Sequence, residues 1–275
     1  EFKIQVYDER NGTGYLRHVL VRRGFATGQV MVVLVAVSPI FKLQKPFLAK
    51  LLRLHPEITT VVLNINDRFT PVVLGRKEKP IYGDGYIEDV LCSRRFRISS
   101  RSFYQINPVQ TEILYARAAE LACLRESDTV LDAYCGVGTI GLSVAERVKQ
   151  VIGVELSHDA VEDAIANARL NNVKNCWFTC GDAGKYMEQM AADGVTPDAV
   201  FIDPPRSGCD GRFLASLMKA APGRVVYISC DPETLKNDLG ILQRGGYSVK
   251  KIQPVDMFPF TNHVETVVLM SRVDK

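Results

Sequence analysis

The chain of 275 residues is 47% hydrophobic and 24% charged, so it can bury one large core, or one core and a smaller domain. No apolar run approaches the roughly 18–20 residues of a membrane span, and the charged first residues do not resemble a secretion signal. Seven scattered cysteines without a regular spacing favour a reducing cytoplasm. These features argue against a membrane-spanning protein and against a fold held by disulfides.

The net charge of +3 is unevenly distributed along the chain. Residues 1–101 hold 17 Lys/Arg against 9 Asp/Glu, or +8, and the remainder holds 17 against 22, or −5. A basic segment of this kind is either a solvated face or a module that holds a polyanion beside a more neutral catalytic module. Both interpretations stay open from charge alone.

Residues 1–98 are predicted to form a strand-rich domain. The expected strands are β-branched runs bounded by Gly, Asn or Pro, namely VLVRRG (19–24), QVMVVLVAV (29–37), TTVVLNIN (59–66) and TPVVLG (70–75). One helix is expected from about Phe41 to Leu54, because leucines recur on or near one face. Since the sequence does not begin with Met, we expect it to be part of a longer protein.

After a helical segment at 107–124, the chain alternates apolar strands with helices, which predicts a parallel sheet covered on both faces. The expected strands are 129–134, 151–156, 176–182, 199–204 and 224–230, with helices at 139–148, 158–171, 183–192, 211–220 and 232–244. Two last strands, about 247–257 and 263–272, have no helix between them and should be antiparallel. Residues 99–275 are thus predicted to be an α/β, Rossmann-like domain with a mostly parallel seven-stranded sheet, the layout of AdoMet-dependent methyltransferases.

A glycine-rich stretch, CGVGTIG (135–141), follows the first of these strands and satisfies GxGxxG. Glu155 lies 17 residues after Gly138, a spacing that fits either a dinucleotide or AdoMet. Asp132, just before the glycines, suits the cationic amino-acid end of AdoMet and would repel a pyrophosphate. Glu155 can pair with both ribose hydroxyls. These features favour AdoMet over a dinucleotide, and over glycines that only make a turn.

The stretch Asp203-Pro204-Pro205-Arg206 follows the fourth strand. Its two prolines predict a stiff loop without backbone donors, able to hold a planar base and present Asp203 to the base or to the ligand. A related loop with Asn or Asp and a final Tyr marks amino-group methylation of adenine or glutamine. Arg206 stands at that position here, which weakens the adenine interpretation; the alternative is a rigid turn with no role.

Cys230 ends the fifth strand and precedes Asp231, a good helix N-cap, and Pro232, a good first helical residue. The helix dipole and free amides should therefore favour the thiolate of Cys230, which predicts a nucleophile rather than a core residue. Glu265 interrupts the apolar start of the last strand and is the candidate general base, ahead of His263 in the turn before it.

Together these residues resemble the bacterial RNA 5-methyluridine methyltransferases, and more closely those of the ribosomal RNA type. The resemblance rests on six stretches in order, SFYQINPVQTEILY, VLDAYCGVGTIGL, GVE, DPPR, SCDPETL and MFPFTNHVE. It implies a central RNA-binding domain, residues 1–98, followed by a catalytic domain, residues 99–275. The implied activity is AdoMet-dependent methylation of carbon 5 of a uridine in RNA, with 23S ribosomal RNA as the expected substrate and transfer RNA as the alternative.

The resemblance also implies roles for single residues. Cys230 falls on the nucleophile and Glu265 on the general base. The implied AdoMet-binding positions are Gln105, Tyr134, Gly136, Glu155, Asp182 and Asp203. Phe103 and Arg206 fall beside the reacting base. Many family members carry an N-terminal oligonucleotide-binding barrel, and several add cysteines for an iron–sulfur cluster. Neither feature is visible here, so we expect a fragment without the barrel, and no metal in this chain.

Several rival interpretations remain open. An RNA cytosine-5 methyltransferase uses similar chemistry, but two cysteines at neighbouring strand ends are then expected. An adenine amino methyltransferase would need no nucleophile, and a dehydrogenase would need a hydride-acceptor site. A non-catalytic RNA-binding module is the rival of a different class. The expectation that we carry forward is a monomeric cytoplasmic enzyme that binds AdoMet and RNA and does not enter a membrane.

Overall fold

The computed structural model describes residues 1–273, which divide into two compact units. The first comprises Glu1–Val90 with Arg95–Ser102, and the second comprises Leu91–Arg94 with the chain from Phe103 onward. Within the described residues, no helix has both the length and the apolar character needed to cross a membrane.

The first unit is built on a four-stranded sheet of order β1-β2-β3-β4. Its strands are β1 (Leu16–Arg23), β2 (Val30–Ala36), β3 (Ile58–Ile65) and β4 (Lys77–Tyr82). Strands β5 (Tyr86–Leu91) and β6 (Arg94–Ser99) follow as a separate two-stranded sheet, whose connecting residues Leu91–Arg94 are assigned to the second unit. Strands β2 and β3 run parallel, and the helix α1 (Gln44–Leu54) connects them. Phe47, Leu48 and Leu51 of α1 pack on the buried residues of this sheet, so the predicted apolar face of the helix is confirmed.

The strand predicted at residues 70–75 is wrong, because that segment forms bends. The side-chain amide of Asn66 donates to the carbonyl oxygens of Val72 and Val73, at 2.7 and 3.1 Å, so these groups have partners outside any strand ladder. The strand that pairs with β3 is β4, whose sequence KEKPIY is charged and mostly exposed. Its composition carries little β-propensity, which is why the sequence pattern missed it.

The second unit is an α/β domain built on a seven-stranded sheet of order β12-β13-β11-β10-β7-β8-β9. The strands are β7 (Thr129–Ala133), β8 (Gln150–Glu155), β9 (Cys176–Cys180), β10 (Ala199–Ile202), β11 (Arg224–Ser229), β12 (Tyr247–Val255) and β13 (Glu265–Arg272). Strands β7 to β11 are parallel, and β13 pairs antiparallel with both β11 and β12. The predicted Rossmann-like sheet with a terminal antiparallel hairpin is confirmed.

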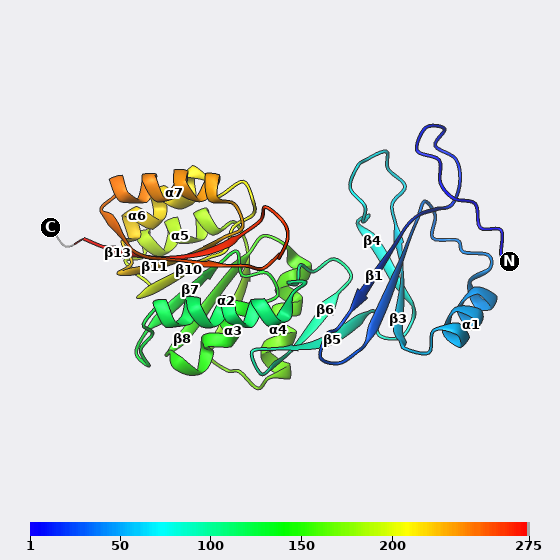
Figure 1. The fold of residues 1–275 in the computed structure, drawn as a ribbon, viewed down its shortest axis with the longest axis horizontal. Helices are drawn as coiled ribbons and strands as arrows, with labels where there is room; N and C mark the ends of the chain where they lie inside the picture. The colour runs from blue at the N-terminus through cyan, green and yellow to red at the C-terminus, as the bar shows by residue number, and fades with distance from the viewer. Residues whose placement is uncertain (274–275) are drawn as a thin grey trace. The chain divides into compact units, whose positions relative to one another are not determined.

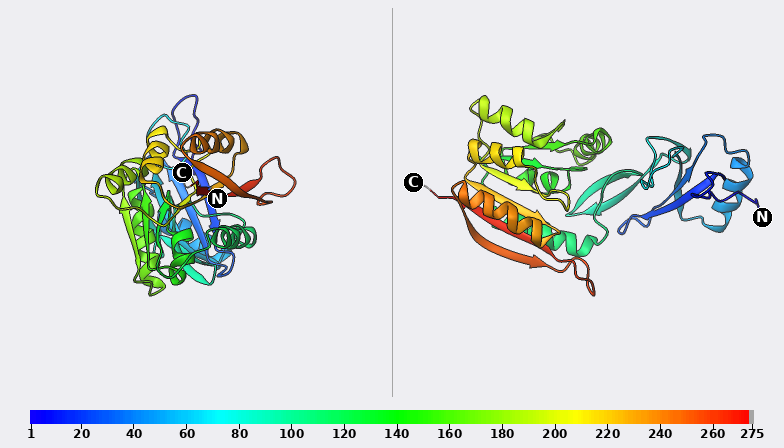
Figure 2. Two further views of the ribbon diagram at one scale, coloured as in Figure 1. Left: turned by 90° about the vertical axis from the view of Figure 1, so that its left-hand side faces the viewer. Right: turned by 90° about the horizontal axis from the view of Figure 1, so that it is seen from above.

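Helices cover both faces of this sheet (Figure 1). One face carries α2 (Pro108–Leu121), α3 (Thr139–Val144) and α4 (His158–Leu170), and the other carries α5 (Ala183–Ala192), α6 (Gly211–Ala220) and α7 (Pro232–Arg244). Figure 2 shows the same layers from two further directions. The core is apolar, and its largest fully buried side chains include Phe201, Phe213 and Tyr227. Burial of such apolar surface stabilises the fold.

Side-chain caps determine where four of these helices begin. Ser157, Asp182, Asp210 and Asp231 each accept a hydrogen bond from a backbone N–H in the first turn of α4, α5, α6 and α7. Each of these helices follows a parallel strand. The caps therefore gather four helix N-termini at the carboxyl edge of the sheet, which is where open α/β sheets bind ligands.

Candidate active site

A cavity of about 620 Å³ lies at the carboxyl edge of the seven-stranded sheet, and this volume is typical of small-ligand sites. Residues that end or follow all five parallel strands contribute to its lining. The ten residues to which the family resemblance assigns a role are all among the lining residues, namely Phe103, Gln105, Tyr134, Gly136, Glu155, Asp182, Asp203, Arg206, Cys230 and Glu265. The topology thus brings residues from seven different segments to one place.

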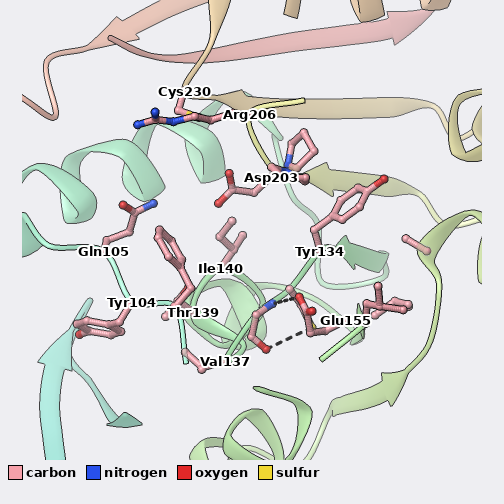
Figure 3. A pocket seen from close by; sticks show the side chains of 18 of the residues that line it. Tyr104, Gln105, Tyr134, Val137, Thr139, Ile140, Glu155, Asp203, Arg206 and Cys230 are labelled. Carbon is pink, nitrogen blue, oxygen red and sulfur yellow. Dashed lines mark hydrogen bonds between the residues drawn. The ribbon is translucent and has the colours of Figure 1, made fainter. Parts of the chain in front are cut away.

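A hydrogen bond joins the glycine-rich loop to Glu155 in the lining of the cavity. The carboxylate of Glu155 accepts from the N–H of Gly136 at 3.1 Å (Figure 3). It also accepts from the N–H of Ser157 at 2.8 Å. Gly136 has a φ of +54°, and a Cβ added there would meet no atom within 4 Å. The loop therefore leaves open space beside Glu155, and the carboxylate keeps lone pairs free to accept from a ligand.

Asp132 does not reach the cavity, so the expectation that it meets a ligand's amino group was wrong. The residue is 0% exposed, and its Oδ2 accepts from the N–H of Gly141 at 2.8 Å. Burial raises the pKa of Asp132 to about 7, with Glu155 adding to the rise. Because its carboxyl group accepts a hydrogen bond from the first turn of α3, Asp132 stabilises the glycine-rich loop that leads into this helix.

Cys230 lies between β11 and α7, as predicted, but the amides of the helix are not free. The side chain of Asp231 accepts from the N–H groups of Glu233 and Thr234, at 2.9 and 3.1 Å. Burial raises the pKa of the Cys230 thiol and nearby Glu265 raises it further, whereas Arg206 lowers it. The pKa of Cys230 is thus raised, not lowered as expected from the helix terminus, because burial and Glu265 dominate and Asp231 takes up the two amides.

The rate at which Cys230 reacts with iodoacetamide is expected to rise with pH across the neutral range. Only the thiolate reacts, and a pKa above the ordinary value of about 8.5 keeps the free protein mostly in the thiol form at pH 7. Mass spectrometry of the peptide that contains Cys230 measures the rate, and the exposed Cys123 in the same sample controls for reagent activity. A rate that reaches its plateau below pH 7 would contradict the raised pKa of the Cys230 thiol.

Two carboxyl groups face the thiol. Burial raises the pKa of Asp203 to about 8, with contributions from Glu265 and Asp132. Burial also raises the pKa of Glu265, which is 4% exposed, and Arg206 opposes that rise. A carboxyl group with a raised pKa is suited to take up a proton near neutral pH. His263, the alternative base, is exposed and does not line the cavity.

Figure 3 shows how the labelled side chains are distributed. Cys230 and Arg206 lie together at the top of the view and Glu155 lies near the bottom, with Asp203 between them. The sequence did not single out Tyr115 and Thr139, whose hydroxyl groups lie 3.0 Å apart in the lining. Tyr115 belongs to α2, and only its place on the buried face of that helix could have indicated a role.

A second cysteine, Cys135, also lines the cavity. It is buried, and burial, Asp132 and Glu155 together raise its pKa well above the ordinary value. Cys230 is the less buried of the two and has Arg206 beside it. Of these two thiols, Cys230 is therefore the better placed to ionise and react.

The parallel sheet with its reversed last strand, the glycine loop and the acidic residue at the end of β8 define a Rossmann-like methyltransferase domain. Residues 42–273 match the family described as tRNA (Uracil-5-)-methyltransferase. The chain belongs to this family.

Relatives and a solved structure agree with this placement. The chain is 44% identical over 273 residues to an uncharacterized RNA methyltransferase of Enterococcus faecalis, covering 99% of this chain and 60% of the relative. It is 46% identical over 270 residues to one of Halalkalibacterium halodurans, covering 98% and 59%. The tRNA (uracil-54, C5)-methyltransferase of Pyrococcus abyssi, solved in complex with S-adenosyl-L-homocysteine, is 30% identical with a TM-score of 0.79, covering 98% and 63%. The chain thus spans about 60% of the length of the curated relatives it matches.

Proposed function

We propose that the protein methylates carbon 5 of a uridine in RNA, with AdoMet as methyl donor and Cys230 as covalent nucleophile. The observation that carries the proposal is that Cys230, Glu265 and Asp203 line the same cavity as Glu155 and the glycine-rich loop. Carbon 5 of uracil is a poor nucleophile by itself, so this reaction needs both a nucleophile and a separate base beside the ring.

The residues of the cavity fit AdoMet. The open space at Gly136, and at Gly181, where an added Cβ would also meet no atom within 4 Å, leaves room for a ligand against the backbone. Glu155, already braced by two N–H groups, can accept from two ribose hydroxyls. Gln105, Tyr134, Asp182 and Asp203 supply further polar and aromatic contacts. When bound, AdoMet supplies an electrophilic methyl group.

The chain's own residues perform the remaining chemistry on the uracil. The thiolate of Cys230 adds to carbon 6, and the electron pair of the 5,6 double bond moves into the ring to form an enolate. Carbon 5 thereby becomes nucleophilic and gains the methyl group. Glu265 then removes the hydrogen that carbon 5 still carries, the double bond re-forms, and the sulfur–carbon bond breaks. Arg206 lies beside Cys230, where its charge favours the thiolate.

RNA that contains 5-fluorouridine should trap the adduct. A base cannot remove fluorine as a proton, so the sulfur–carbon bond is expected to persist once carbon 5 carries the methyl group. A 23S ribosomal RNA transcript with this substitution should yield a band of covalent protein–RNA complex on a denaturing gel, only when AdoMet is added. The same transcript with ordinary uridine is the control. Lack of any AdoMet-dependent band, with both 23S and transfer RNA transcripts, would refute the proposal.

The RNA itself is part of the proposal. The stretch GTIGL (138–142), which follows Cys135, resembles the ribosomal RNA enzymes more than the transfer RNA ones, and we take 23S ribosomal RNA as the first candidate. The similarity to a solved tRNA (uracil-54, C5)-methyltransferase favours transfer RNA as the second. We assign residues 1–98 to RNA binding because they hold most of the excess positive charge, which is suited to phosphates. The target uridine must be unstacked to enter the cavity.

A further inference from the structure

One buried carboxylate, Asp238, joins three segments around Cys230 although it does not line the cavity. It lies on α7 and is 6% exposed. Its Oδ2 accepts from the hydroxyl group of Tyr227 at 2.7 Å and from the N–H of Cys209 at 2.8 Å. Tyr227 belongs to β11, the strand that precedes Cys230, and α7 is the helix that follows it. Asp238 therefore connects both elements that flank Cys230 to the loop that ends at Cys209.

That loop is the one that carries Arg206. Gly208 has a φ of +77°, and a Cβ added there would lie 2.9 Å from Oδ2 of Asp238 and 3.3 Å from Cβ of Thr234. The N–H of Gly208 donates to the carbonyl oxygen of Pro205 at 2.9 Å, which closes the loop into a turn. The loop backbone thus lies directly against α7, at a distance that only glycine permits.

The position of Arg206 matters for the chemistry of the site. The charged groups that act on Cys230 are Glu265, Arg206 and Asp203, and Arg206 is the cation among them. It lowers the pKa of both Cys230 and Glu265. The Arg206 side chain is exposed, and its backbone is held near α7 by the turn at Gly208 and the bond to Cys209. A shift of this loop would therefore change the charge balance at the thiol.

We propose that Asp238 is a positioning residue, which holds the Arg206 loop against α7 and thereby keeps Arg206 beside the Cys230 thiol. Any effect of Asp238 on the methylation rate rests on the proposed function, in which Cys230 is the nucleophile. The effect on the thiol is independent of any RNA. A purely structural Asp238 would stabilise the fold without changing the pH dependence of Cys230.

The test compares Asp238→Ala with Asp238→Asn by alkylation of Cys230 across pH. Loss of the acceptor in Asp238→Ala should shift the profile to higher pH and slow alkylation at pH 7.5 by about threefold to tenfold, a shift of roughly half to one pKa unit. Asp238→Asn keeps an oxygen that can accept both bonds and should stay within about twofold of the parent protein. A folded Asp238→Ala variant with an unshifted profile overturns the proposal.

A double-variant cycle shows whether the effect passes through Arg206. In an Arg206→Ala background, Asp238→Ala should produce no further shift in the Cys230 profile; a full shift in that background overturns the proposal. If Asp238→Ala does not fold, Gly208→Ala keeps Asp238 and displaces the loop, and the same shift is expected. Normal methylation by Cys230→Ala would instead refute the proposed function and leave these alkylation results standing.

Discussion

Methylation of RNA is expected to fall by at least about a thousandfold when Cys230 is replaced by alanine, because removal of a covalent nucleophile blocks the first chemical step. AdoMet affinity should stay within about twofold, since the braced Glu155 and its glycine loop do not depend on the thiol. Transfer of labelled methyl groups to RNA measures the first quantity, and isothermal titration calorimetry measures the second.

The matched controls are the other cysteines. Cys123→Ala changes an exposed thiol and should retain the parent rate. Cys135→Ala removes the second cysteine of the cavity, which is the rival nucleophile, and should retain methylation because that thiol is buried with a strongly raised pKa. Near-normal methylation by Cys230→Ala together with its loss in Cys135→Ala would transfer the role of nucleophile to Cys135.

Replacement of Glu265 by glutamine is expected to leave thiolate addition and methyl transfer intact and to stop the removal of hydrogen from carbon 5. Glutamine has nearly the same shape but cannot take the hydrogen from carbon 5, so the Cys230–uracil bond should persist. Turnover should fall by about a hundredfold to ten-thousandfold, the usual contribution of a general base. The adduct should appear with ordinary, unsubstituted RNA as a slowly migrating band on a denaturing gel, and only with AdoMet present.

Two comparisons make that result specific to Glu265. His263→Gln changes the alternative base, which is exposed outside the cavity, and should release product at the parent rate. The double variant Cys230→Ala, Glu265→Gln should form no band, since no nucleophile remains. Full product release by Glu265→Gln without an adduct would remove Glu265 from the mechanism.

The centre of the sheet of the second unit was predictable because its central strands are buried on both faces. Val130 and Leu131 of β7 and Val200 and Phe201 of β10 are almost fully buried, so each of these two strands is a short apolar run bounded by helical patterns. Where such a run ends, the chain leaves the sheet at the carboxyl edge. Polar residues at these points could therefore be assigned to one cavity without knowledge of any distance.

Features that depend on hydrogen-bond partners were not predictable in this way. The side-chain amide of Asn66 donates to the backbone within the bends at 70–75. The carboxylate of Asp132 accepts from the N–H of Gly141 and does not line the cavity. The amides near Cys230 are occupied by Asp231, although the same residue was correctly recognised as the cap. Asp238 resembles an ordinary helix residue in the sequence, and only its two bonds connect it to the site.

Methylation of carbon 5 of uridine can be tested by identifying the nucleoside that receives the methyl group. The most direct measurement incubates RNA from cells that lack the enzyme with labelled AdoMet, digests the RNA to nucleosides and identifies the labelled one, before mapping its position in the ribosomal or transfer RNA. Because the chain spans about 60% of its curated relatives, the full-length protein should be used. Label is expected in 5-methyluridine alone. Label in cytidine or adenosine, or none in any RNA, would contradict it.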